Sequence, residues 1–234
     1  MSQISRPFQV LPVLNRSSLR GAFLSFEGID GCGKSTQALR LVENLREKGL
    51  AVHHTREPGG TEIGQKIRAL LLHPDHTAME PQAELLLYLA DRLQHLAQDI
   101  RPALARGETV ICDRFHDATV AYQQYGRGLD FTAVQPLIDR EILPTMPVTT
   151  FWLDVSVATA QARIASRAGQ PPAGDRLEES RLDDESTAFH ERVRSGYAQL
   201  HHAAQDRIVR LDAEQDMETI HQEILRAVGE RHEL

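Results

Sequence analysis

The residue pattern with the clearest chemistry is G-I-D-G-C-G-K-S at residues 28–35. It fits G-x-x-x-x-G-K-[ST], a loop whose backbone N–H groups bind nucleotide phosphates. The apolar residues 23–26 before it predict a buried strand, and residues 36–48 after it predict a helix. The N-terminus of such a helix adds positive potential. We therefore expect a phosphate site in which Lys34 reaches the outer phosphates and the Ser35 hydroxyl holds Mg²⁺.

Two arginines follow other predicted strands. Arg56 comes directly after the strand expected at residues 50–55. Arg114 follows the buried apolar run at residues 109–113, whose last residue, Asp113, is placed to associate with Mg²⁺. Because ligands of open α/β sheets bind at the carboxyl ends of the strands, both arginines are expected near the phosphate loop, where they would bind a second phosphate. Either arginine alone is equally compatible with a surface ion pair, but the two together favour a phosphorylated acceptor.

The elements that must position these residues alternate between strands and helices. This alternation predicts an α/β domain with the phosphate-loop NTPase fold, in which an open parallel sheet of about five strands carries helices on both faces and a lid segment. Pro102 is expected to kink or divide a long helical stretch, and Ser180 with Asp183 predicts a helix N-cap. The predicted strands are residues 23–26, 50–55, 109–113, 148–155 and 207–211, and the predicted helices are residues 36–48, 61–72, 80–106, 131–143, 157–168, 183–205 and 217–228.

Composition excludes several classes of protein. The net charge of −7 argues against a nucleic-acid-binding or membrane surface, and no apolar run is long enough to span a membrane. Cys32 and Cys112 form no disulfide or metal pattern, which favours a reducing, cytoplasmic location. The histidines show no spacing that indicates a metal site.

Residues 1–21 precede the single domain that we predict at residues 22–234. They include Arg6, Arg16 and Arg20, several serines and no acidic residue. That composition is shared with organellar transit peptides. We expect a disordered N-terminal extension or an alternative start site here, with a transit peptide as the open alternative.

Further motifs occur at residues 28–36, 55–61 (T-R-E-P-G-G-T), 87–92 (L-Y-L-A-D-R), 113–115 (D-R-F), 121–123 (A-Y-Q), 125–129 (Y-G-R-G-L) and 175–178 (D-R-L-E). Together they resemble the bacterial-type thymidylate kinases, over nearly the whole chain. The resemblance implies transfer of the γ-phosphate of ATP to dTMP, giving dTDP, with Mg²⁺ as cofactor and a homodimer as the assembly. Two alternatives stay open: a kinase of the same fold with another base preference, and a phosphate-loop switch that binds a partner.

The resemblance also assigns roles to single residues. Lys34, Asp30 and Arg114 are expected in catalysis, and Ser35 and Asp113 at Mg²⁺. Tyr88 would stack on thymine, and Arg92, one helical turn later, would hydrogen-bond its edge. The residues expected to bind ATP are Gly28, Ile29, Asp30, Gly31, Cys32, Gly33, Lys34, Ser35 and Thr36. Those expected to bind dTMP are Asp30, Arg56, Tyr88, Arg92, Arg114, Thr119, Tyr122 and Gln123, with Tyr122 as the steric bar to a ribose 2′-hydroxyl.

The lid, at about residues 168–180, is expected to supply a catalytic arginine. In the family that the chain resembles, this charge comes either from the phosphate loop or from the lid. Because Gly31 follows Asp30 here, the loop itself supplies only Lys34. Arg163 and Arg167 are spaced i and i+4, which places them on one helix face just before the lid, and we favour Arg167.

Two positions depart from the family pattern. Ala118 stands where serine is usual, which removes one hydroxyl unless Thr119 replaces it. Tyr88 stands where phenylalanine is common, and its hydroxyl needs a hydrogen-bond partner.

Overall fold

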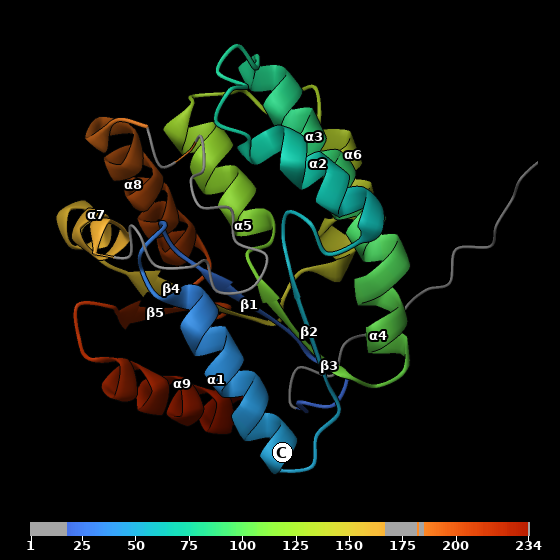
Figure 1. Cartoon of the computed structure of the whole chain (residues 1–234). Coiled ribbons are helices and arrows are strands. Elements are labelled where there is room, and N and C mark those ends of the chain that lie inside the picture. Colours follow the sequence, from blue (N-terminus) through green and yellow to red (C-terminus); the bar gives the residue numbers. More distant parts are fainter. Residues whose placement is uncertain (1–17, 167–181, 183–184, 234) are drawn as a thin grey trace, which may run out of the picture.

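The computed structural model describes residues 18–166, 182 and 185–233. Its strands are β1 Phe23–Glu27, β2 Val52–Arg56, β3 Thr109–Asp113, β4 Thr149–Asp154 and β5 Ile208–Asp212. They form one parallel sheet in the order β2-β3-β1-β4-β5 (Figure 1). Because all strands point the same way, the residues that follow β1, β2 and β3 meet at one edge of the sheet.

Helical segments connect the strands and cover both faces of the sheet (Figure 1). Their bounds are α1 Lys34–Glu47, α2 Glu62–Leu72, α3 Pro81–His95, η1 Leu96–Ile100, α4 Arg101–Ala105, α5 His116–Thr119, η2 Val120–Gly126, α6 Gln135–Glu141, η3 Leu143–Thr145, α7 Val157–Ala165, α8 Thr187–Ala203 and α9 Met217–Arg231. Two of these, η1 and η2, are π-helical, and η3 is a 3-10 turn.

Both faces of the sheet are buried. Leu24 and Phe26 of β1 pack in one apolar cluster with residues of α1 and α9. Phe23, on the opposite face of β1, packs in a second cluster with residues of α3, α4 and α6. Since side chains alternate between the two faces of a strand, a strand covered on both sides is mainly apolar, as in the run at residues 109–113.

The sequence-based helix boundaries need correction in two places. The helix predicted at residues 131–143 is shorter and forms only α6. It begins next to Pro136, because a proline in the first turn of a helix loses no intrahelical hydrogen bond. Pro144, the residue directly after the predicted helix, lies inside η3. The stretch at residues 80–106 is divided as predicted, but by η1, which ends two residues before Pro102.

The structure also corrects one helix cap and adds a helix. The side chain of Ser186 caps α8 by accepting a hydrogen bond from the backbone N–H of Phe189. The predicted cap residues, Ser180 and Asp183, lie outside the described residues. Residues 116–126 form the continuous helical segment of α5 and η2, which the apolar periodicity did not predict.

The described fold includes residues 18–21, ahead of the predicted domain start at residue 22. Leu19 is fully buried. Its backbone N–H donates to Glu233 O at 3.0 Å, and its carbonyl accepts from the Thr109 hydroxyl at 2.7 Å. Among the described helices, none is both long and apolar enough to cross a membrane.

Candidate active site

The phosphate loop connects β1 to α1 and is built mainly from backbone. Gly31 and Gly33 have φ values of 86° and 96°, in the left-handed region that favours glycine. A Cβ atom on Gly31 would lie 2.4 Å from the carbonyl oxygen of Ala160 in α7, so no larger residue fits. Lys34 is the first residue of α1. The loop therefore presents backbone N–H groups and a helix N-terminus to an anion.

Beside the loop, two cations meet at one carboxylate. Lys34 Nζ lies 3.1 Å and Arg114 Nη2 lies 2.9 Å from Asp30 Oδ1. Arg114 has a left-handed backbone, with φ of 70°, and its guanidinium also donates to the hydroxyls of Tyr122 and Tyr197. Burial opposes ionisation of Asp30, but Arg114 and Lys34 hold the pKa of this carboxyl far below its usual value. Asp30 is therefore an anion throughout the physiological pH range.

The residues predicted at Mg²⁺ lie together at the mouth of the loop. The Ser35 hydroxyl donates to Asp113 Oδ2. The other oxygen, Asp113 Oδ1, is buried and has no hydrogen-bond partner in the described structure. An unpartnered carboxylate oxygen next to a hydroxyl is the kind of ligand Mg²⁺ takes when nucleotide phosphates complete its shell. These two side chains thus fit the metal that the phosphate loop implies.

A cleft lies next to Asp30 and Arg114. It is formed mainly by α2, α3, α5, η2 and the loops after β1, β2 and β3. Its lining includes every residue predicted to bind dTMP except Arg56. The lining residues are Asp30, Glu57, Pro58, Arg68, Leu72, Tyr88, Arg92, Arg114, Phe115, Ala118, Thr119, Tyr122, Gln123 and Leu182.

Arg68 is a lining residue that the sequence reasoning missed. Its Nη1 donates to Pro58 O at 2.9 Å, whereas its Nε is buried without a hydrogen-bond partner among the described residues. Burial and the nearby Arg56 lower the pKa of the Arg68 guanidinium. A bound anion would accept a hydrogen bond from Nε and would also favour the charged form of the guanidinium. Its place in the predicted helix at residues 61–72 is the only signal that the sequence offers for Arg68.

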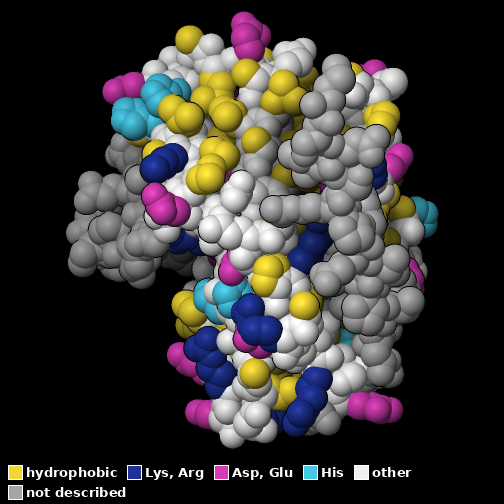
Figure 2. All heavy atoms as spheres, turned by 90° about the vertical axis from the view of Figure 1, so that its right-hand side faces the viewer, with side chains coloured by type: hydrophobic (Ala, Val, Ile, Leu, Met, Phe, Trp, Pro, Cys, Tyr) yellow, Lys and Arg dark blue, Asp and Glu magenta, His cyan; other side chains and the backbone are white. Residues whose placement is uncertain are grey.

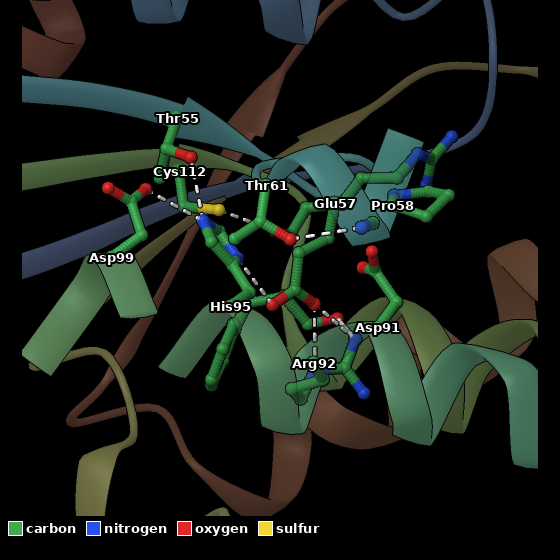
Figure 3. Close-up of polar contacts among 12 residues, drawn as sticks. Thr55, Glu57, Pro58, Thr61, Asp91, Arg92, His95, Asp99 and Cys112 are labelled. Carbon is green, nitrogen blue, oxygen red and sulfur yellow. Dashed lines mark hydrogen bonds and ion pairs between the residues drawn. The ribbon is translucent and has the colours of Figure 1, made fainter. Parts of the chain in front are cut away.

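Arg92 lines the cleft and is held by groups from several elements, of which Glu57 is labelled in Figure 3. Its Nε donates to Glu57 Oε2 at 2.7 Å, and its Nη1 donates to the Thr119 hydroxyl at 2.7 Å. Its Nη2 donates to Phe115 O at 3.0 Å. Only 2% of Arg92 is exposed. The structure therefore places Arg92 at the cleft, as predicted, but commits much of its guanidinium to the protein itself.

The buried partners of Arg92 extend to His95. His95 Nδ1 donates to Glu57 Oε1 at 2.9 Å, and its Nε2 lies 3.2 Å from Asp99 Oδ2. Burial disfavours the imidazolium, but hydrogen bonds to Asp99 and Glu57 outweigh it and raise the pKa of His95 to about 9. Burial, reinforced by Glu57, raises the pKa of Asp91 to about 7. Glu57 is thus the centre of this network. It lies in the T-R-E-P-G-G-T motif, but the sequence alone assigns it no function.

The two candidate lid arginines are placed differently. Arg163 lies in the last turn of α7. Arg167 and the lid at residues 168–180 lie outside the described residues.

A phosphate loop that shares a border with a cleft lined by arginines defines a class: the phosphate-loop kinases that act on small phosphorylated molecules. The thymidylate kinase family model matches residues 26–224 of this chain. A thymidylate kinase from Exiguobacterium sp. is 44% identical, covering 91% of this chain and 96% of that relative. One from Nostoc sp. is 42% identical, covering 87% and 93%.

A solved structure agrees with these sequences. The crystal structure of a thymidylate kinase from Ehrlichia chaffeensis superposes with a TM-score of 0.70 at 31% identity, covering 89% of this chain and 98% of that one. The chain belongs to the thymidylate kinase family and is an enzyme that phosphorylates dTMP.

Proposed function

We propose that the enzyme transfers the γ-phosphate of ATP to the 5′-phosphate of dTMP, giving dTDP, with ATP at the phosphate loop and dTMP in the cleft. The observation that carries this assignment is the meeting of Lys34 and Arg114 at Asp30. A cation of the donor site and a cation of the acceptor site then contact the same carboxylate oxygen, Asp30 Oδ1. Two phosphates held there face each other across a short path, although they repel.

Lys34 and Arg114 supply charge to the reacting phosphates. Because Lys34 begins α1, its ammonium and the helix N-terminus act on the same phosphates. Arg114 is fixed by Asp30 and two tyrosine hydroxyls, so it needs no reorganisation when the acceptor phosphate arrives. Ser35 and Asp113 would hold Mg²⁺, and the chemistry that the metal supplies when bound is neutralisation of nucleotide charge.

The base and sugar would be recognised by the far end of the cleft. Tyr88 would stack on thymine, and Arg92 would present its remaining N–H groups to the base edge. Tyr122 lies against Asp30, with its hydroxyl 3.3 Å from Oδ2, and would act as the steric bar to a ribose 2′-hydroxyl. Arg56 would act beside Arg68 at the acceptor phosphate.

A lid arginine would complete the transition state. Arg167, or Arg163 four residues before it, would stabilise charge on the migrating phosphoryl group, a contribution that can reach about 10³–10⁵ in rate in related chemistry. Replacing Arg167 by alanine is expected to lower kcat by orders of magnitude with little change in ATP binding. A kcat within about threefold of wild type in Arg167→Ala, Arg163→Ala and the double variant would exclude a lid arginine.

We also propose that the enzyme is a homodimer in the cytoplasm. Ile63 and Leu70 are half-exposed on one face of α2, and Leu86 is half-exposed on the adjoining α3. Figure 2 shows hydrophobic side chains gathered over these helices. A second copy would remove this apolar area from water, and sedimentation equilibrium tests for it. The free thiols of Cys32 and Cys112 support a reducing compartment.

The central test is a coupled assay with ATP against a panel of nucleoside monophosphates and nucleosides. The proposal expects dTMP to be the preferred acceptor and nucleosides to be inactive. A preference for another base would instead support a related nucleotide kinase, and nucleotide hydrolysis without any acceptor would support a switch protein.

A further inference from the structure

The side-chain amide of Gln123 is held in one orientation at the wall of the cleft. Gln123 is 1% exposed and lines the cleft from the π-helical η2. Its Nε2 donates to Glu84 Oε1 at 2.5 Å. Its Oε1 is buried and accepts no hydrogen bond within the described part of the chain. The buried acceptor is therefore available to a ligand, and such a group costs free energy until a donor reaches it.

The carboxylate of Glu84 determines the orientation of the Gln123 side-chain amide. Arg127 binds the Glu84 carboxylate with two donors, Nε to Oε1 at 2.8 Å and Nη2 to Oε2 at 3.1 Å. A carboxylate in such a bidentate pair accepts hydrogen bonds and donates none. The amide of Gln123 must then turn its NH₂ toward Glu84 and its oxygen away from it. Arg127 is itself held by Glu185 at 2.9 Å and lies over the ring of Phe189.

Glu84 also lies in register with the two base-binding residues of α3. Glu84, Tyr88 and Arg92 are spaced i, i+4 and i+8, so they share one face of the helix. The stacking residue, the edge-binding arginine and the carboxylate that orients Gln123 are thus positioned by one rigid element. Glu84 is completely buried, which keeps water from competing for the amide.

We propose that Glu84 is a specificity-determining positioning residue, which makes Gln123 present an acceptor and so selects a base with an N3–H donor. Thymine has that donor, whereas cytosine carries an acceptor at N3. An acceptor facing an acceptor leaves two buried groups unpaired, and a site built to make a hydrogen bond rejects a ligand that cannot complete it. This inference rests on the proposed placement of dTMP in the cleft.

The test compares dTMP with dCMP in Glu84→Gln. The glutamine keeps the size of the side chain and one acceptor for Arg127. Its own NH₂, however, can donate to the Gln123 oxygen, so the Gln123 amide can adopt the reversed orientation. The ratio of kcat/KM for dTMP over dCMP is expected to fall at least about tenfold, mainly through KM. Glu185→Gln is the matched control, because it removes a carboxylate from the same arginine without touching Gln123, and it should keep the wild-type ratio.

A second variant separates orientation of the amide from general damage. Gln123→Leu removes the amide, so adding Glu84→Gln to it should change the ratio by less than about twofold further. An unchanged ratio in folded Glu84→Gln, or in Gln123→Leu, would overturn the inference, as would equal losses in Glu84→Gln and Glu185→Gln. If Glu84→Gln does not fold, Gln123→Leu alone decides. Failure of the wild-type enzyme to accept dTMP would instead refute the proposed function.

Discussion

The phosphate loop and the cleft beside it share one edge of the sheet but are built differently. The loop is a continuous stretch of chain in which backbone N–H groups and a helix N-terminus provide the site, with Lys34 and Ser35 as its principal side chains. The cleft draws its side chains mainly from α2, α3, α5, η2 and the loops after β1, β2 and β3. Many of these side chains are buried and bonded to one another before any ligand arrives.

This difference separates stability from activity. A side chain such as Lys34, whose partner is the loop carboxylate Asp30, contributes mainly to ligand binding and charge stabilisation. A side chain such as Arg92 also neutralises a buried carboxylate, so its loss removes structure as well as function. Substitutions on the cleft side should therefore lower both the free energy of unfolding and the activity, whereas those in the loop should lower activity alone.

The largest effect on stability is expected from Arg92→Ala. It leaves the buried Glu57 carboxylate without its guanidinium partner, and breaking such a pair costs about 3–5 kcal/mol. The dTMP KM should rise and discrimination against dCMP should weaken. Urea unfolding and steady-state kinetics measure the two effects, with Gln82→Ala, at an exposed position of α3, as the control. An unchanged dTMP KM would show that Arg92 only supports the fold.

The second-largest effect is expected from pH. Deprotonation of His95 at high pH should lower the free energy of unfolding. Its pKa is raised from 6.5 to about 9 on folding, so its contribution is complete below about pH 6.5 and is lost as pH rises through about 9. That shift corresponds to about 3 kcal/mol. Unfolding free energies measured from pH 6 to 10 should fall steeply in the wild type and less in His95→Gln, while the exposed His202→Gln should follow the wild type. Parallel curves for wild type and His95→Gln would contradict the assignment.

Lys34→Ala should separate activity from stability. Phosphoryl transfer is expected to fall at least about a hundredfold, equivalent to about 2.7 kcal/mol of transition-state stabilisation. The unfolding free energy should stay within about 1 kcal/mol of wild type, as for Lys48→Ala at the exposed end of α1. Full activity of a folded Lys34→Ala protein would refute the phosphate-loop mechanism.

The same contrast explains what the sequence could predict. The phosphate loop is local, so its spacing, its strand and its helix were all visible in consecutive residues. The network of Glu57, Arg92 and His95 joins β2 to α3, and no local pattern reports such a contact. The helix at residues 116–126 was missed because η2 is π-helical and breaks the 3.6-residue period. Its wider turn brings the consecutive residues Tyr122 and Gln123 to the same cleft.

Arg68 lies between the two kinds of site and gives the smallest expected effect. It lines the cleft, but its own protein contacts leave Nε without a partner among the described residues. If it binds the acceptor phosphate, Arg68→Ala should raise the dTMP KM about tenfold, equivalent to about 1.4 kcal/mol, with a smaller change in kcat. The KM for ATP should not change, nor should either constant in Lys66→Ala, an exposed position on the same helix.

Inhibition by thymidine distinguishes a phosphate contact from a change in the shape of the cleft. Thymidine has the same base and sugar as dTMP but no phosphate, so its inhibition constant should be the same in Arg68→Ala and wild type. The alternative role for Arg68 is to hold the loop after β2 through its bond to Pro58 O. In that case the dTMP KM and the thymidine inhibition constant would rise together, because a displaced wall weakens every ligand of the cleft. Equal shifts in the two constants would therefore assign Arg68 to the scaffold, and a shift in KM alone would assign it to the phosphate.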